Sequence, residues 1–270
     1  MTDAAIPAAT LVTWRDPVAA GAAPLILVVE RSAKMAFAAG ALVFPGGRID
    51  AEDRSLAAAL GRPDDAAKVS AIRETIEESG VAPALHGDLS PALGLALQQS
   101  LIDGAPFADL LAGHGLALDL DALVPFARWL PAFAHARTFD TMFFLAPAPV
   151  GDWAPRPQPG ECAAAEWASP VDLIARIDRG EASAIFPTKR NLERLARHAD
   201  FAAAIADADA YPVDTITPWI EEVAGQRHVC IPADRGYPVT SEPLDTAFRA
   251  SNDSTRAHEK GARGKPGPLS

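Results

Sequence analysis

Cysteine is scarce in this sequence, since only Cys162 and Cys230 occur in 270 residues. Two cysteines are too few for a disulfide framework, so we interpret both as small apolar residues of a reducing compartment. Long apolar runs are also missing, because no stretch approaches the roughly 18 consecutive apolar residues that a membrane span needs. Residues 1–17 lack a basic segment followed by an apolar run and therefore do not predict a secretory signal. We expect a soluble, cytoplasmic protein with no membrane partner.

Basic charge is in deficit, with 24 lysines and arginines against 35 aspartates and glutamates and a formal net charge of -11. This balance excludes a nucleic-acid binder that works through a broad basic surface, so we expect no nucleic-acid partner. It also makes a phosphorylated ligand unexpected, since an acidic surface repels anions. Disorder along the whole chain is excluded, because 49% of the residues are hydrophobic and can bury a sizeable core.

Several familiar enzyme signatures are absent. No Gly-x-Ser-x-Gly pentapeptide occurs, which removes the usual serine-hydrolase interpretation. No glycine-rich loop ends in Gly-Lys-Ser or Gly-Lys-Thr, so an NTPase motor is not indicated. The six histidines show no His-x-x-x-His spacing, so a zinc site is not indicated either.

What is present is an alternation of strand and helix patterns, which predicts one domain of the α/β or α+β class over residues 10–245. Strands are indicated by short apolar, β-branched or aromatic runs, and helices by apolar residues at helical spacing. The predicted elements are strands at 24–29, 41–44, 139–145 and 163–168, and helices at 66–79, 170–179 and 188–207.

The composition of the segments between these elements predicts their structure. Glycine and proline predict a loop with at most one helical turn at 50–65 and a loop at 151–160. Leucines and alanines at helical spacing predict a small helical insertion at about 84–127. Residues 246–270 lose the apolar periodicity and carry five basic and two acidic side chains, so we expect a disordered basic tail.

The most informative segment is residues 73–81, RETIEESGV, at the end of a predicted helix. Glu74, Glu77 and Glu78 share one helix face, where like charges repel by a few tenths of a kcal/mol per pair. They also lie in the last turn, where the helix dipole disfavours negative charge. The simpler alternative is a solvated acidic face. A divalent cation removes both objections, because Mg²⁺ and Mn²⁺ bind carboxylate oxygens, and Arg73 can orient a carboxylate with two hydrogen bonds.

Upstream, the sequence FPGG at residues 44–47 ends a strand in a turn whose backbone can approach a ligand or metal closely. This turn and residues 73–81 together resemble the signature of the Nudix hydrolases. In that signature a glycine, five residues, a glutamate and seven residues precede Arg-Glu-hydrophobic-x-Glu-Glu-x-Gly-hydrophobic. Here Asp53 replaces the first glutamate, nineteen residues instead of seven follow it, and Thr75 fills the hydrophobic position.

The elongated motif resembles the coenzyme A and acyl-coenzyme A diphosphatase group of that family. Two further stretches are similar to the group, RTFDTMFFLAP at 137–147 and ECAAAEWASP at 161–170. Arg31 and Ser32 fall in register with its upstream motif, whereas Ala36 replaces a second arginine. That replacement slightly favours the alternative of a nucleotide-sugar, ADP-ribose or dinucleotide diphosphatase.

The resemblance implies a Nudix α/β/α sandwich with a mixed β-sheet, and hydrolysis of a pyrophosphate bond in a nucleoside diphosphate-linked substrate. It implies Mg²⁺ or Mn²⁺ as cofactor, with Glu74, Glu77 and Glu78 as metal ligands and the carbonyl of Gly46 or Gly47 as a further candidate. A homodimer is a possible assembly. A non-catalytic ligand sensor on the same fold is a weaker alternative, since all three glutamates are present.

The resemblance also implies roles around the metal. Glu77 and Glu78 are candidate catalytic residues, Arg73 orients the carboxylates, and the water-activating base lies in the motif or on a later loop. Glu161 is our candidate for that loop base, and an ordinary exposed glutamate is the alternative. Arg31 is a candidate phosphate contact, with a surface ion pair as the alternative.

Two other groups of residues have a structural and a functional interpretation. Phe139 and Phe143 fit a hydrophobic core better than a base-stacking platform. Residues 187–190, PTKR, fit the start of a helix better than an anion site built on a helix N-terminus.

Overall fold

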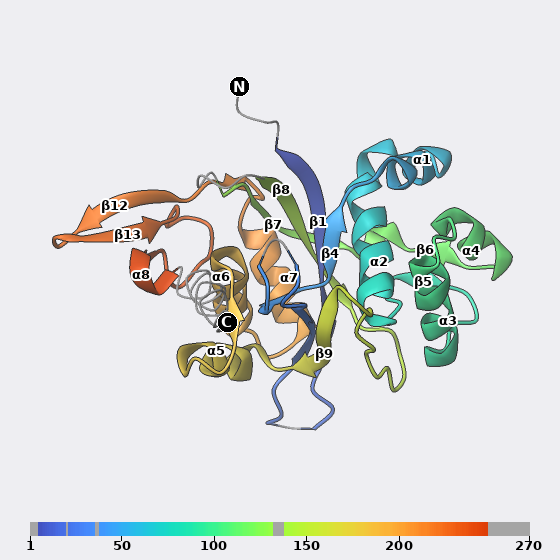
Figure 1. The fold of residues 1–270 in the computed structure, drawn as a ribbon, viewed down its shortest axis with the longest axis horizontal. Coiled ribbons are helices and arrows are strands. Elements are labelled where there is room, and N and C mark those ends of the chain that lie inside the picture. The colour runs from blue at the N-terminus through green and yellow to red at the C-terminus, as the bar shows by residue number, and fades with distance from the viewer. Residues whose placement is uncertain (1–4, 20, 36–37, 132–137, 248–270) are drawn as a thin grey trace, which may run out of the picture.

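The computed structural model describes residues 5–19, 21–35, 38–131 and 138–247 (Figure 1). Its main sheet is built from β1 (Ile6–Arg15), β2 (Leu25–Arg31), β3 (Ala41–Val43), β4 (Gly46–Arg48), β7 (Val124–Trp129), β8 (Phe139–Pro147), β9 (Cys162–Ala168), β10 (Ser183–Ala184) and β11 (Thr215–Ile216). The strand order is β10-β3-β2-β1-β8-β7-β11, with β4 also paired to β1 and β9 to β2. Parallel and antiparallel pairs both occur, so the sheet is mixed as predicted.

Strand β1 lies at the centre of this sheet. It runs parallel to β8 from Ile6 opposite Phe139 to Trp14 opposite Pro147, and antiparallel to β2 and β4. Because successive side chains of a strand point to opposite faces, Trp14 enters one hydrophobic core and Leu11 enters the other.

Helices cover both faces of the sheet and bury these two cores. The first face carries α1 (Ala51–Ala59), α2 (Ala66–Ser79), α3 (Pro91–Ile102) and α4 (Phe107–Gly113), and the second carries α5 (Pro170–Asp178), α6 (Phe186–Leu195) and α7 (Phe201–Ala210). Figure 1 shows the two sets on opposite sides of the sheet. This arrangement confirms the predicted α/β/α sandwich.

The helix predicted at 66–79 is confirmed with the same bounds as α2. It ends where Gly80 adopts a φ of 70°, and the Gly80 N–H donates to the Ile76 carbonyl over 2.8 Å. The four predicted strands correspond to β2, β3, β8 and β9. The predicted loop at 151–160 contains no helix or strand.

Two predictions about helices were wrong. Residues 50–65 are not a loop, because Asp50 and Asp53 form a capping box that starts α1 and Ala57 anchors the helix in the core. Residues 188–207 are not one helix, because α6 ends at Leu195 and Asp200 starts α7 by accepting a hydrogen bond from the Ala203 N–H over 2.8 Å.

The predicted insertion at 84–127 is only partly helical. It contains α3 and α4, a short pairing of β5 (Leu85–His86) with β6 (Ala117–Leu118), and the first residues of β7. The predicted helical insertion is therefore confirmed by α3 and α4, but it ends before residue 124, where the main sheet resumes.

The C-terminal segment forms a second, three-stranded sheet that projects from the sandwich (Figure 1). It consists of β12 (Trp219–Val223), β13 (Gln226–Cys230) and β14 (Ser241–Pro243), followed by α8 (Leu244–Ala247). Of the predicted tail at 246–270, the part from residue 248 onward lies outside the described residues. No helix in the described part of the chain combines the length and the apolar character that crossing a membrane requires.

Candidate active site

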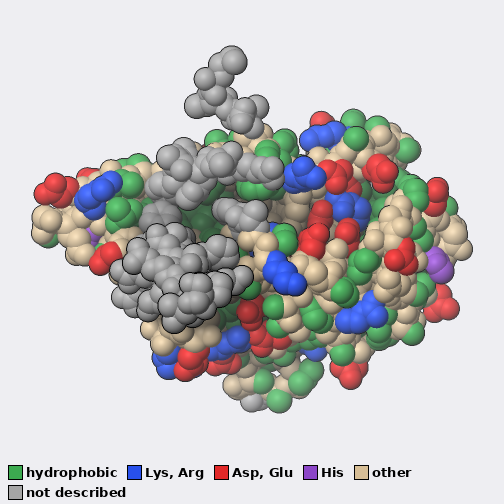
Figure 2. Space-filling model, in the orientation of Figure 1, with side chains coloured by type: hydrophobic (Ala, Val, Ile, Leu, Met, Phe, Trp, Pro, Cys, Tyr) green, Lys and Arg blue, Asp and Glu red, His purple; other side chains and the backbone are tan. Residues whose placement is uncertain are grey.

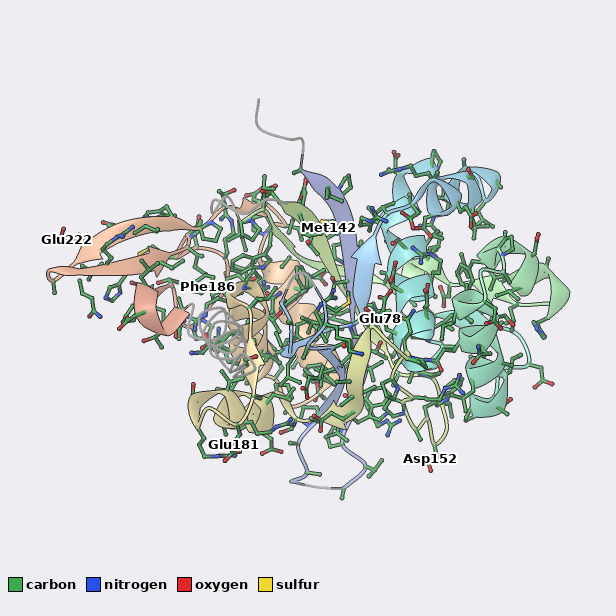
Figure 3. All side chains as sticks on the ribbon, viewed as in Figure 1. Glu78, Met142, Asp152, Glu181, Phe186 and Glu222 are labelled. Carbon is green, nitrogen blue, oxygen red and sulfur yellow. The ribbon has the colours of Figure 1, made fainter. Side chains whose placement is uncertain are left out.

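The predicted carboxylates lie on the C-terminal half of α2, next to β4. In Figure 3, Glu78 lies between α2 and the strands of the sheet. Figure 2 shows acidic and basic side chains intermixed over this region on the face in view. The loop at 151–160 and the start of β9 complete the surroundings, as the contacts described below show.

Arg73 is the hub of an ion-pair cluster. Its guanidinium holds Asp53 through two hydrogen bonds, Nε to Oδ1 at 2.8 Å and Nη2 to Oδ2 at 2.9 Å. It also pairs with Glu74 at 3.0 Å and with Glu77 at 3.2 Å. Asp53 stands at the position of the first glutamate in the motif that the sequence resembles. Because Asp53 is buried, it fixes Arg73 next to the other carboxylates.

Glu74 packs directly against the glycine turn. A Cβ added to Gly47 would collide with the Glu74 carboxylate, so a glycine is needed at this position. Burial raises the pKa of Glu74 to about 7, while the charge of Arg73 acts in the opposite direction. The Glu74 carboxylate is thus largely shielded from water and lies next to a residue that has no side chain.

Glu78 is the most deeply buried of the three glutamates, with 3% of its surface exposed. Its Oε2 accepts a hydrogen bond from the Gly46 N–H over 3.0 Å, which links α2 to β4. Burial, reinforced by the charge of Glu74, raises the pKa of Glu78 to about 8. The Gly46 N–H and the charge of Arg31 lower it, so Arg31 acts on this carboxylate.

Glu77 is held on both of its carboxylate oxygens. Oε2 accepts from Arg73 at 3.2 Å, and Oε1 accepts from Gln158 Nε2 at 3.3 Å. Burial raises the pKa of Glu77, the charge of Arg73 lowers it, and the charge of Glu161 raises it again. Glu161 therefore lies close enough to interact with the glutamates of α2.

The pairing of β2 with β9 brings Arg31 and Glu161 to the same place. Arg31 lies opposite Cys162, and the Ser32 N–H donates to the Glu161 carbonyl over 2.7 Å. The Glu161 side chain is exposed, while Cys162 beside it is buried. The structure thus brings together all the predicted site residues, Arg31, Gly46, Gly47, Arg73, Glu74, Glu77, Glu78 and Glu161. Ala36 lies outside the described residues.

The end of α2 is fixed by residues that the sequence analysis did not single out. The last carbonyls of a helix have no partner within it. Here the Glu77 carbonyl accepts from Gln98 Nε2 at 3.1 Å, the Glu78 carbonyl from the Gln158 N–H at 3.1 Å, and the Ser79 carbonyl from the Arg156 N–H at 2.7 Å. These contacts give the last carbonyls of α2 hydrogen-bond partners outside the helix.

The carboxylates are arranged around Arg73. Among the residues that the structure describes, no group of three or more His, Cys, Asp and Glu side chains is placed so that it could hold a metal ion as it stands. Glu74 and Glu77 both face the guanidinium instead. The donor chemistry nevertheless fits a hard divalent cation, since buried carboxylates with raised pKa values gain from a neighbouring positive charge.

Of the two groups with alternative interpretations, Phe143 and residues 187–190 are structural, whereas Phe139 at the start of β8 is only half-buried. Phe143 is buried and packs edge-to-face on Phe44 with ring centroids 6.4 Å apart, as expected for a core residue. Helix α6 starts at Phe186, and Lys189 and Arg190 pair with carboxylates, including a 2.7 Å contact from Lys189 to Glu242. Their charges are therefore already compensated.

Comparisons with known proteins give two informative relatives, although no protein-family model matches the chain. A crystal structure of a NUDIX hydrolase from Alicyclobacillus acidocaldarius superposes with a TM-score of 0.65 and 30% sequence identity, covering 76% of this chain and 97% of that chain. The acyl-coenzyme A diphosphatase NUDT19 of Gallus gallus is 28% identical and covers 58% of this chain. The chain spans 57% of the length of that relative.

Proposed function

Because the chain belongs to the Nudix hydrolase family, we propose that it cleaves the pyrophosphate bond of a nucleoside diphosphate-linked substrate with the help of a divalent metal ion. One observation carries this proposal. The glutamates of α2, the Gly46 backbone and the strand pair that bears Arg31 and Glu161 converge on one site. Pyrophosphate hydrolysis needs charge neutralisation and an activated water, and this set of groups suits both needs.

The metal would be held by Glu74, Glu77 and Glu78, all members of the helix end that faces β4. When bound, a divalent ion polarises phosphoryl oxygens and lowers the pKa of a bound water. Mg²⁺ and Mn²⁺ are both suited to carboxylate oxygens, and we propose one of them as the cofactor. The carbonyl of Gly46 or Gly47 is a further candidate ligand, because the turn lies directly beside Glu74 and Glu78.

The remaining residues position the metal ligands, the attacking water and the substrate. Arg73 sets the relative positions of the carboxylates, because it binds Asp53, Glu74 and Glu77 at the same time. Glu161 is exposed to water beside the site and is our proposed base that accepts a proton from the attacking water. Arg31, whose charge acts on Glu78, is our proposed contact for a substrate phosphate.

For the substrate we propose coenzyme A or an acyl-coenzyme A, cleaved to adenosine 3',5'-bisphosphate and phosphopantetheine or its acyl form. The elongated motif and the similarity to the acyl-coenzyme A diphosphatase of Gallus gallus support this choice. Ala36, which stands where that group has an arginine, favours a nucleotide sugar, ADP-ribose or a dinucleotide as the alternative.

A substrate panel tests the proposal. The purified protein is incubated with coenzyme A, an acyl-coenzyme A, ADP-ribose and a dinucleotide, each with Mg²⁺, with Mn²⁺ and with EDTA, and the products are identified by mass. We expect both halves of coenzyme A to be released only when a divalent ion is present. Turnover of ADP-ribose or the dinucleotide alone would replace the substrate and leave the reaction class intact, whereas no turnover of any phosphoanhydride refutes the proposed function.

A further inference from the structure

We infer that Gln158 is a positioning residue of this site, which fixes Glu77 and the loop of Glu161 relative to each other. The inference rests on the proposed function, because it assigns to Gln158 a task in that reaction. Gln158 lies in the loop between β8 and β9, yet only 7% of its surface is exposed. A glutamine in a loop is usually solvated, so its burial here needs an explanation.

The side chain of Gln158 completes the support of Glu77. Arg73 Nη1 donates to one carboxylate oxygen at 3.2 Å, and Gln158 Nε2 donates to the other at 3.3 Å. A single donor leaves a carboxylate able to rotate about its terminal torsion, which has a broad energy profile. Two donors on opposite oxygens fix the plane of the group, so the direction of its remaining lone pairs is set as well.

The main chain of Gln158 connects the same carboxylate to the loop glutamate. Its N–H donates to the Glu78 carbonyl over 3.1 Å, and its carbonyl accepts from the Cys162 N–H over 3.0 Å. The second bond closes the turn that contains Glu161. One residue therefore touches the end of α2, the Glu77 carboxylate and the turn that presents the proposed base.

The carboxamide oxygen of Gln158 distinguishes it from a purely structural amide. This atom is buried and has no hydrogen-bond partner among the described residues. Leaving a buried acceptor without a partner destabilises the folded state. It belongs to the amide that contacts Glu77, so water on a divalent ion held by Glu77 would supply the O–H donor that this oxygen lacks.

Gln98 offers a matched comparison within the same structure. It is a buried glutamine of α3 that contacts the end of α2. Its Nε2 donates to the carbonyls of Glu77 and Arg156, and its Oε1 accepts from Arg156 Nε over 2.7 Å. All of these partners are structural, and none is a carboxylate of the site. A substitution of Gln98 therefore reports what loosening the end of the helix does by itself.

The test compares Gln158→Met with Gln98→Met, since methionine nearly preserves the shape of glutamine and removes its hydrogen bonds. Three quantities are measured: the Mn²⁺ dissociation constant from the EPR signal of free Mn²⁺, kcat and KM on the best substrate, and Tm. We expect Gln158→Met to weaken Mn²⁺ binding about tenfold and to lower kcat about tenfold with KM nearly unchanged. We expect Gln98→Met to lower Tm while the Mn²⁺ dissociation constant and kcat stay within about twofold.

Gln158→Asn provides a second variant that keeps an amide but shortens its reach, and we expect the same losses with a Tm close to that of the wild type. Equal Mn²⁺ binding and kcat in wild type and both Gln158 variants overturn the inference. Equal losses in the Gln98 and Gln158 variants overturn it too, because loosening the helix end then accounts for everything. If the wild type cleaves no phosphoanhydride, the proposed function fails, and the Mn²⁺ dissociation constants still decide the position of Gln158.

Discussion

Each face of the sheet buries a cluster of charged side chains, and the two clusters differ in their ratio of cations to carboxylates. On the face of α2, Arg73 is surrounded by Asp53, Glu74 and Glu77, and Glu78 lies beside them. On the face of α6, by contrast, cations and carboxylates pair evenly: Lys189 and Arg190 with Glu193 and Glu242, and Arg194 with Asp207.

The difference shows which cluster needs a partner from outside. The α6 cluster pairs its buried cations with a similar number of carboxylates, so it requires no further positive charge. The cluster at α2 has more carboxylates than arginines, and a divalent ion would compensate the excess negative charge. A metal ion bound there would also reconcile an acidic protein with a polyanionic substrate, because the ion rather than lysines would attract the phosphates. Substitutions in the two clusters should therefore have different consequences.

Arg190→Met breaks the balanced cluster. Arg190 is 1% exposed, and its removal leaves carboxylates buried with less compensation, which typically costs about 3–5 kcal/mol. Urea unfolding should show this loss, with activity retained at temperatures where the variant is folded. Arg179→Met removes an exposed ion pair with Glu181 and should cost at most about 1 kcal/mol. An equally mild effect at both positions would show that the buried network contributes little.

Glu77→Gln breaks the unbalanced cluster. We expect kcat to fall about 10²-fold or more, because a metal ligand or proton acceptor is lost. Glu193→Gln makes the same chemical change on the other face and should leave kcat within about twofold. Steady-state kinetics at saturating Mn²⁺ measure both variants, and an unchanged rate in Glu77→Gln would remove this residue from the site.

Gly47→Ala introduces a methyl group where the Glu74 carboxylate lies. The carboxylate is the far end of a flexible side chain and can move aside, so its displacement should weaken Mn²⁺ binding more than it lowers stability. Gly113→Ala is the control, because open space surrounds that position. Thermal unfolding and Mn²⁺ titration of the two variants should therefore diverge, and similar behaviour would contradict the close packing of Gly47 on Glu74.

The pH dependence of Tm in the metal-free protein tests the same contrast without any substitution. The folded-state pKa values of about 7 for Glu74 and about 8 for Glu78 exceed the ordinary value of 4.5. At pH values between the ordinary pKa and these raised pKa values, the folded state binds more protons than the unfolded state. The free energy of unfolding therefore falls as pH rises from about 5 to 8. Tm measured in EDTA should show this decline, and saturating Mg²⁺ or Mn²⁺ should reduce it.

Glu78→Gln separates this effect from the other face. Burial also raises the pKa of Glu193 to about 7, so this residue contributes to the same pH range in both proteins. The decline in Tm should therefore be shallower in Glu78→Gln than in the wild type, but not absent. If Tm declines equally with pH in both proteins, Glu78 does not cause this pH dependence.

Local patterns predicted some elements well. The bounds of α2 followed from apolar spacing and from Gly80, since both signals lie within a few residues. The start of α7 was missed although Asp200 is a typical N-cap residue, because the apolar spacing continues across the break. Helix α1 was missed because its polar face and the nearby Gly61 and Pro63 outweighed the capping box of Asp50.

The candidate site was predictable to the extent that it lies in a contiguous motif. Helical periodicity alone places Glu74, Glu77 and Glu78 on one face of a helix, because they are three and four residues apart. The supporting contacts of Gln98 and Gln158 were not predictable, because they join positions 21 and 81 residues apart. Sequence spacing carries no information on such pairs without the fold.

The fixed end of α2 has a consequence for the order in which the molecule assembles. Its last carbonyls are satisfied by Gln98 and by the loop at 156–158, which is far away along the chain. Closing a long loop costs entropy that local helix contacts do not recover, so the final turn of α2 should become rigid late in folding. In the native protein the same amides should be among the earlier ones to exchange with solvent when the loop detaches. The carboxylates that we propose as metal ligands would then be the last part of the helix to take shape and an early part to be released.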